Sequence, residues 1–206
     1  MSYLQELNPG LFRWSEFSDE KQLNFNGYYL VNREEAVIID PPDLSDEGMT
    51  ELKGRITDHA RSPLKAVLLT NVHHDRASLK FKETFHIPIY VHENDKDLLD
   101  FTPDHTFKGD EILFCGLKVI HLKEQKSPGE SAFLLEDQKK LFVGDALIGK
   151  TPGKINLLPP EKYKDIHKAK EALKVLKSYD FDDLLLGDGE PVQGDAKKLL
   201  EAFFND

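Results

Sequence analysis

Short strand-like runs that each end in a polar loop are the feature that most constrains the fold of this chain. The clearest is Ala66 to Thr70 (AVLLT), an all-apolar run of the kind buried in α/β proteins, and NVHHDR follows it. Three more polar loops follow apolar strands: Lys126 to Ser131, Gly144 to Ala146, and Gly187 to Gly189. Because α/β folds place their sites where buried strands end, these loops are expected to carry the function.

The remaining pattern predicts two groups of strands with helices around them. Near the N-terminus we expect an antiparallel meander of Leu11 to Trp14, Asn26 to Val31 and Ala36 to Asp40, then a surface helix from Ser45 to Ala60. Further strands are expected at Pro88 to Val91, Ile112 to Phe114, Leu117 to His121, Ser131 to Leu135, Lys140 to Val143 and Asp183 to Leu186. Further helices are expected from about Ala77 and at Glu93 to Leu99, Pro160 to Ser178 and Gly194 to Phe204. This order favours two sheets packed face to face over one doubly wound sheet.

Length, charge and cysteine count exclude several classes of protein. The 206 residues suffice for a single domain over 1–206, and one cysteine, Cys115, excludes an intramolecular disulfide and fits the cytoplasm. The start of the chain has no basic segment followed by an apolar run, so neither secretion nor membrane insertion is expected. A formal net charge of −10 argues against nucleic acid or an anionic membrane as a partner. The oligomeric state stays open.

Together the four loops resemble those of the metallo-β-lactamase superfamily, in particular the glyoxalase II-like (hydroxyacylglutathione hydrolase-like) branch. The family pattern is a Thr-His-x-His-x-Asp-His loop, a Gly-His-Thr-Pro-Gly-Ser-like loop, a Gly-Asp at a strand end and a late Gly-His-Gly. Each loop is present here in altered form, from about Leu11 to the C-terminus. The resemblance implies a four-layer αβ/βα sandwich, with two face-to-face mixed β-sheets and helices outside.

The resemblance also implies a degenerate metal site. It keeps His73, Asp75 and Asp145 at metal-binding positions of the family. The other four such positions hold different residue types: Asn71, Arg76, Lys126 and Asp188.

The best remaining set of metal ligands is His73, Asp75, Asp145 and Asp188. One nitrogen and three carboxylates suit manganese or magnesium better than zinc. The resemblance places Arg76 and Lys126 in the same pocket, and a cation about 4 Å from a divalent ion repels it by about 8 kcal/mol at an effective dielectric constant of 20. Since two cations already offset part of the three negative charges, we expect no metal, or one weakly bound divalent ion such as zinc or manganese.

Ordinary structural roles remain open for each of these residues. Asp75 could cap the following helix, Lys126 could be solvated, and the aspartates after Gly144 and Gly187 could be turn residues. A one-residue adjustment of the loop would also turn His74, rather than His73, into the pocket.

Two hypotheses about function follow. In the first, the eroded centre binds a small, anionic molecule through Asn71, Arg76 and Lys126, with little or no zinc. The alternative is a metal-dependent hydrolase of a small ester, thioester or phosphoester that uses the four metal-ligand candidates. In that case His74, as a proton carrier, and Asp75 are the catalytic candidates. The sequence decides neither the substrate nor whether activity is retained.

Overall fold

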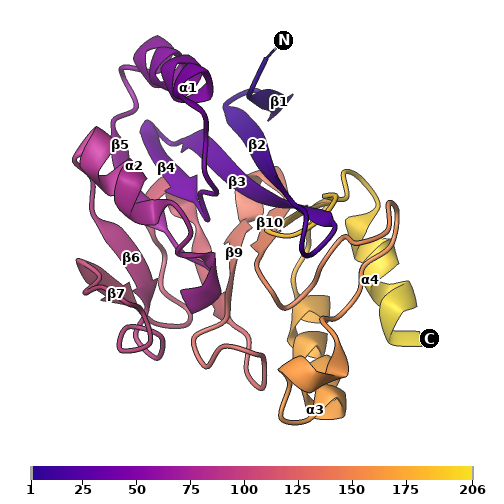
Figure 1. Ribbon diagram of the computed structural model, residues 1–206. Helices are drawn as coiled ribbons and strands as arrows, with labels where there is room; N and C mark the ends of the chain where they lie inside the picture. Colours follow the sequence, from indigo (N-terminus) through magenta and orange to yellow (C-terminus); the bar gives the residue numbers. More distant parts are fainter. Residues whose placement is uncertain (1, 206) are drawn as a thin grey trace.

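The computed structural model of the protein describes residues 2–205 and contains two β-sheets (Figure 1). One has seven strands in the order β1-β2-β3-β4-β5-β6-β7, and the other has four in the order β11-β10-β9-β8. In Figure 1, α1 and α2 flank one side of the molecule and α3 and α4 the other, with the strands between them. The predicted four-layer αβ/βα sandwich is confirmed.

The seven-stranded sheet begins as a meander and continues as a parallel sheet. Its antiparallel part consists of β1 (Gln5–Asn8), β2 (Leu11–Ser18), β3 (Leu23–Asn32) and β4 (Glu35–Ile39). The strands added in parallel are β5 (Leu64–Leu68), β6 (Ile89–His92) and β7 (His105–Phe107). The helices of this half are α1 (Asp46–Asp58), whose first turn is capped by the Ser45 side chain, and α2 (Ser78–Phe85).

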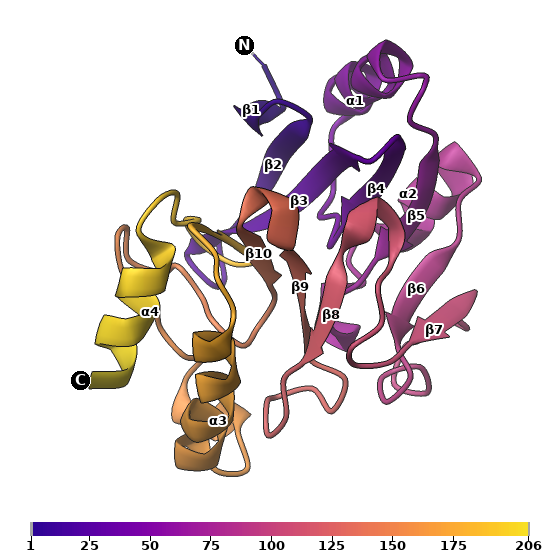
Figure 2. The same cartoon turned by 180° about the vertical axis from the view of Figure 1, so that it is seen from behind.

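The second half of the chain supplies the strands of the four-stranded sheet (Figure 2). Its strands are β8 (Lys118–His121), β9 (Ser131–Leu135), β10 (Lys140–Val143) and β11 (Asp183–Leu186), of which only β10 and β11 pair in parallel. The helices here are α3 (Ile166–Ala172) and α4 (Ala196–Asn205). Within residues 2–205, none of the helices has the length and apolarity that crossing a membrane requires.

Three apolar layers hold the sandwich together. One lies under α1 and α2, one lies under α3 and α4, and the third lies between the sheets. In the middle layer Tyr28 packs edge-on against Phe142 at 5.4 Å between ring centroids, and its hydroxyl donates a hydrogen bond to the Leu186 carbonyl oxygen at 2.7 Å. Burying one such large side chain is worth about 1.5–3 kcal/mol. The middle layer therefore fixes the sheets relative to each other, and with them the loops at their strand ends.

Some predicted elements are wrong. Residues 93–99 form turns instead of a helix, because the Asp95 side chain binds backbone amides of two other loops. Residues 112–114 form an isolated bridge and a 3-10 turn rather than a strand, and the predicted helix over 160–178 is divided into α3 and two 3-10 segments. The short edge strand β1 and the three-residue β7 were not predicted from the sequence.

Candidate functional site

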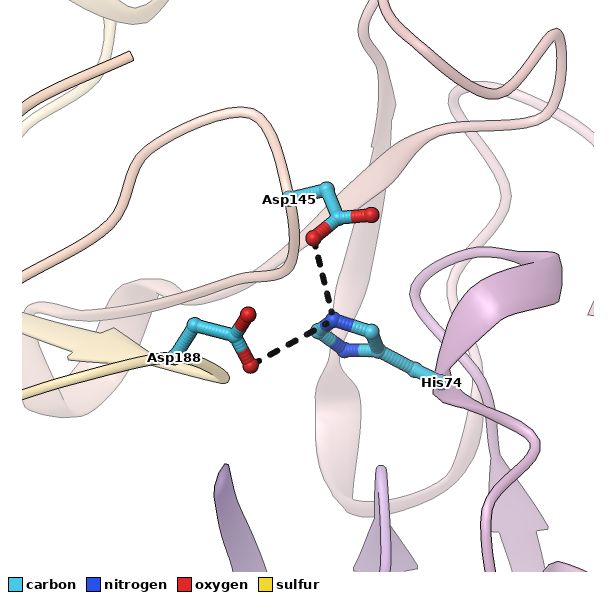
Figure 3. Close-up of side chains that lie close together, drawn as sticks. All are labelled: His74, Asp145 and Asp188. Atoms are coloured by element: carbon cyan, nitrogen blue, oxygen red, sulfur yellow. Dashed lines mark ion pairs between the residues drawn. The ribbon is translucent and has the colours of Figure 1, made fainter. Parts of the chain in front are cut away.

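The four polar loops and the end of β4 converge on a buried group of ionisable side chains. His74 follows β5, Asp145 follows β10 and Asp188 follows β11, and one ligand atom from each lies within 4.8 Å of the others. Figure 3 shows the imidazole of His74 pointing between the two carboxylates. The carboxylate of Asp40, directly after β4, lies next to Nδ1 of the same ring, whereas Asp145 and Asp188 lie next to Nε2. Loops from both sheets thus form one site.

The imidazole of His74 is surrounded by carboxylates. Its side chain is 1% exposed, with Nδ1 2.8 Å from Oδ2 of Asp40 and Nε2 3.5 Å from Oδ1 of Asp145 and 3.8 Å from Oδ1 of Asp188. Burial and the nearby Arg76 guanidinium oppose protonation, but the Asp40 and Asp145 carboxylates outweigh them and raise the pKa of His74 to about 10. At neutral pH the ring is therefore an imidazolium ion.

Two further cations pair with the carboxylates. Lys126 Nζ lies 2.7 Å from Oδ2 of Asp145, and Arg76 NH2 lies 2.5 Å from Oδ1 of Asp188. The guanidinium of Arg76 also lies over the ring of Phe25, 4.4 Å from its centroid. Although burial disfavours the charged form, His74 and Lys126 hold the pKa of Asp145 below its usual value. Both cations thus lie within ion-pair distance of an aspartate.

The charges of this group balance without a metal ion. Three cationic side chains, His74, Arg76 and Lys126, meet the three carboxylates of Asp40, Asp145 and Asp188. A fourth acid, Glu130, is fully buried beside them, and burial together with the Asp145 charge raises its pKa well above the usual value, so it is neutral.

Two glycines allow the loops to come this close. A Cβ atom on Gly144 would lie 2.3 Å from Oγ1 of Thr70, and one on Gly187 would lie 2.5 Å from Cε1 of His74. Any larger residue at either position would push the loops apart. The backbone is strained at two other residues of the site, Asp40 and Arg76, which have φ values of 48° and 32°.

A buried carboxylate, Asp95, holds two of the loops together. It accepts hydrogen bonds from the Val72 amide at 2.8 Å, from the Gly129 amide at 2.6 Å and from the Ser127 hydroxyl. Val72 precedes the two histidines, and Ser127 follows Lys126. Asp95 thus fixes the distance between the His74 loop and the Lys126 loop.

Among the residues expected at metal positions, Asp145 and Asp188 belong to the group, but His73 and Asp75 do not. The Asn71 side chain accepts a hydrogen bond from the His73 amide and caps the 3-10 turn Val72–His74, which turns His74 inward and leaves His73 exposed at the cavity edge. The carboxylate of Asp75 accepts a hydrogen bond from the Arg76 amide. Among residues 2–205 the structure thus brings together His74, Asp145 and Asp188, and the metal-ligand set His73, Asp75, Asp145 and Asp188 stays a prediction.

Two residues of the site were not singled out from the sequence. Asp40 ends the predicted strand Ala36 to Asp40, so the rule that drew attention to Asp145, a carboxylate after a buried strand, applied to it equally. Glu130 lies within the second polar loop, where a single acidic residue next to an apolar strand gives little sign of its burial.

A cavity of about 760 Å³ opens above the ionic group. His74, Arg76, Lys126, Asp145 and Asp188 line it, together with apolar side chains. Lysine and arginine side chains outnumber carboxylates by five to three among its lining residues, in a chain whose formal net charge is −10. The lining of this cavity thus carries an excess of positive charge, in contrast to the chain as a whole.

Comparison with known proteins agrees with the fold. Two curated relatives are probable metallo-hydrolases: one from Streptococcus pyogenes is 29% identical over 68% of this chain and 69% of its own length, and YqgX from Bacillus subtilis is 28% identical over 65% and 71%. Among solved structures, DIM-1 metallo-β-lactamase aligns over 98% of this chain and 94% of its own with a TM-score of 0.77 and 20% identity. The metallo-β-lactamase from Pontibacter korlensis aligns over 98% and 96% with a TM-score of 0.75 and 20% identity. The family model for the metallo-beta-lactamase superfamily matches residues 3–205, and the chain therefore belongs to the metallo-β-lactamase superfamily.

Proposed function

We propose that this protein is a hydrolase-like member of the superfamily whose metal centre is eroded, and that it binds a small anionic molecule with little or no zinc. The observation that carries the proposal is the pairing of Lys126 with Asp145 and of Arg76 with Asp188. These cations stand where the family has metal-binding histidines. They neutralise the carboxylates that would otherwise require a metal ion.

The residues present fit a zinc centre poorly. A divalent ion between Asp145 and Asp188 would replace the proton on Nε2 of His74, whose raised pKa opposes that loss. It would also lie close to two cations, and each repels it by about 8 kcal/mol at 4 Å and an effective dielectric constant of 20. Among residues 2–205 the group of possible ligands contains one nitrogen ligand, His74, so any ion held here would be single and weakly bound, with zinc or manganese as candidates.

One observation favours a second candidate function, a metal-dependent hydrolase of a small ester, thioester or phosphoester. Nε2 of His74 is buried and has no hydrogen-bond partner among residues 2–205, as expected of a metal-binding nitrogen when no metal is bound. In that case His74, Asp145 and Asp188 would hold the ion, and the ion would acidify a water molecule. His73, exposed at the cavity edge, would then be the better placed proton carrier, because His74 would be occupied.

Several broader features belong to the same proposal. The anionic ligand is supported by the excess of cations around the cavity, with Arg76 and Lys126 as its principal contacts. Asn71 is fully buried and supports the loop, so we assign it no contact with the ligand. A kinship with the glyoxalase II-like branch, a single domain over 1–206 and a cytoplasmic location remain predictions.

The metal content of protein purified without chelators tests the proposal. We expect well under one equivalent of zinc or manganese per chain, and no change in the thermal midpoint after treatment with EDTA. Inorganic phosphate should raise that midpoint, and Lys126→Ala should weaken this effect. A tightly bound metal ion in each chain, with hydrolysis lost on chelation, would establish the second candidate instead.

A further inference from the structure

The cavity above the ionic group has walls of two kinds. Its floor is ionic, whereas one side is apolar and is formed by Phe25, Ile148, Leu157, Leu158 and Pro159. Leu157 and Leu158 are only half-buried, so this side presents apolar surface to the cavity. Apolar walls around a few polar groups are typical of sites for small organic molecules.

We propose that the ligand is an amphiphilic anion, with a carboxylate or phosphate head on the floor and an apolar body against Phe25, Leu157 and Leu158. This inference rests on the proposed anion-binding function and adds the class of molecule. A bare inorganic anion would satisfy the floor but leave the apolar wall in contact with water.

The floor retains hydrogen-bond donors for the head group. Lys126 Nζ uses one of its three N–H donors on Asp145, and NH1 of Arg76 makes only long contacts of 3.4 Å to two carbonyl oxygens. His74 is also a lining residue, and its Nε2 is buried and has no hydrogen-bond partner among residues 2–205, with the nearest carboxylate oxygen 3.5 Å away. An oxygen of a head group would satisfy this N–H, and a buried donor left without a partner is costly.

The apolar body has two directions available. A side cavity of about 550 Å³ adjoins the larger one, and His73 and Lys126 line both. The side cavity contains Leu98 and Leu99 but also Asp75 and Asp100, against Lys126 as the one cation among its lining residues. Because those carboxylates disfavour a bound anion, we place the body along the Leu157 and Leu158 wall.

Calorimetric titration of the purified chain with acetate, hexanoate, inorganic phosphate and hexyl phosphate tests the inference. Partial burial of four methylenes should make hexanoate bind at least about tenfold more tightly than acetate. Hexyl phosphate, which adds six carbons to phosphate, should exceed phosphate by at least as large a factor, and the tighter of hexanoate and hexyl phosphate identifies the preferred head group.

Leu158→Ser should weaken hexanoate binding by about threefold to tenfold and leave phosphate binding unchanged. The matched control is Leu98→Ser, which changes a leucine of the side cavity that is 55% exposed and should have no effect. Thermal unfolding checks that both variants are folded. The comparison of short and long ligands uses the unmodified protein, so it stands even if a variant fails to fold.

The outcomes separate this inference from the function on which it rests. Equal affinities for acetate and hexanoate would overturn the amphiphilic ligand while supporting anion binding. A loss on Leu98→Ser instead of Leu158→Ser would overturn the placement of the apolar body. Failure of all four compounds to bind would overturn both the inference and the proposed function.

Discussion

Lys126 Nζ and Oδ2 of Asp145 are 2.7 Å apart, and they join two loops that follow different strands of the four-stranded sheet. The carboxylate side chain is 5% exposed and the lysine side chain 25% exposed. The pair is therefore neither a surface ion pair nor a fully enclosed one. Its loss should affect stability more than the loss of a surface pair does.

Lys126→Ala should lower the free energy of unfolding by about 2 kcal/mol, below the roughly 3–5 kcal/mol of a fully buried pair. The physical reason is that Asp145 would keep its charge with one partner fewer. Urea denaturation measures the change. Lys139→Ala, which removes an exposed pair with Asp180, is the control and should cost no more than about 0.5 kcal/mol. Equal losses in the two variants would mean that Lys126 is solvated.

The raised pKa of His74 predicts a stability that declines in alkaline solution. The folded protein keeps this proton up to about pH 10, whereas the unfolded chain releases it near pH 6.5. The stabilisation is complete below the lower value and falls by about 1.4 kcal/mol per pH unit between the two. The difference in unfolding free energy between the unmodified protein and His74→Gln should therefore shrink as the pH rises through this window. A difference independent of pH would contradict an imidazolium at this position.

Glu130→Gln should become relatively more stabilising as the pH rises above 4.5. In the folded protein burial keeps the Glu130 carboxyl protonated, whereas in the unfolded chain it ionises near pH 4.5. Folding must therefore return a proton at higher pH, which the amide does not require. Glu136→Gln, at an exposed glutamate, serves as control and should show no such trend. Denaturation curves collected from pH 4.5 upward test the sign.

Histidines in place of the two cations should increase the affinity for metal. The double substitution of Lys126→His and Arg76→His removes both cations and adds two nitrogen ligands beside His74, Asp145 and Asp188. We expect zinc to bind at least about tenfold more tightly than to the unmodified protein, as measured by competition with a chromophoric chelator. Unchanged affinity would show that the cations do not determine the metal state.

The layered fold was predictable because runs of apolar residues mark its strands in the sequence. The run Ala66 to Thr70 is apolar throughout, and β5 forms there as Leu64–Leu68, with the polar loop beginning at Asn71 as expected. The run from Glu93 has helix-forming residues, yet its Asp95 binds the Val72 and Gly129 amides. That preference comes from distant backbone, which local propensity does not contain.

The site was predictable in its loops but not in the orientation of each side chain. Adjacent histidines differ in burial because the Asn71 side chain caps a 3-10 turn, and the sequence allows either register. The resemblance places Arg76 in the same pocket as the aspartates but does not select Asp188 as its partner. The packing of the same guanidinium on Phe25 depends on how β3 meets the late loop. Contacts of this kind join residues that are far apart in the sequence, so no spacing along the chain predicts them.

Asp95 accepts hydrogen bonds from both Val72 and Gly129, which has a consequence for how the cavity can open. The amide protons of these two residues depend on a single carboxylate, so they should exchange with solvent in one concerted event rather than separately. The loop that carries His74 and the loop that carries Lys126 should then move together. We therefore expect the motions that admit a ligand to occur in the segment around Leu158, whose amide donates a hydrogen bond to the Tyr163 hydroxyl at 3.1 Å.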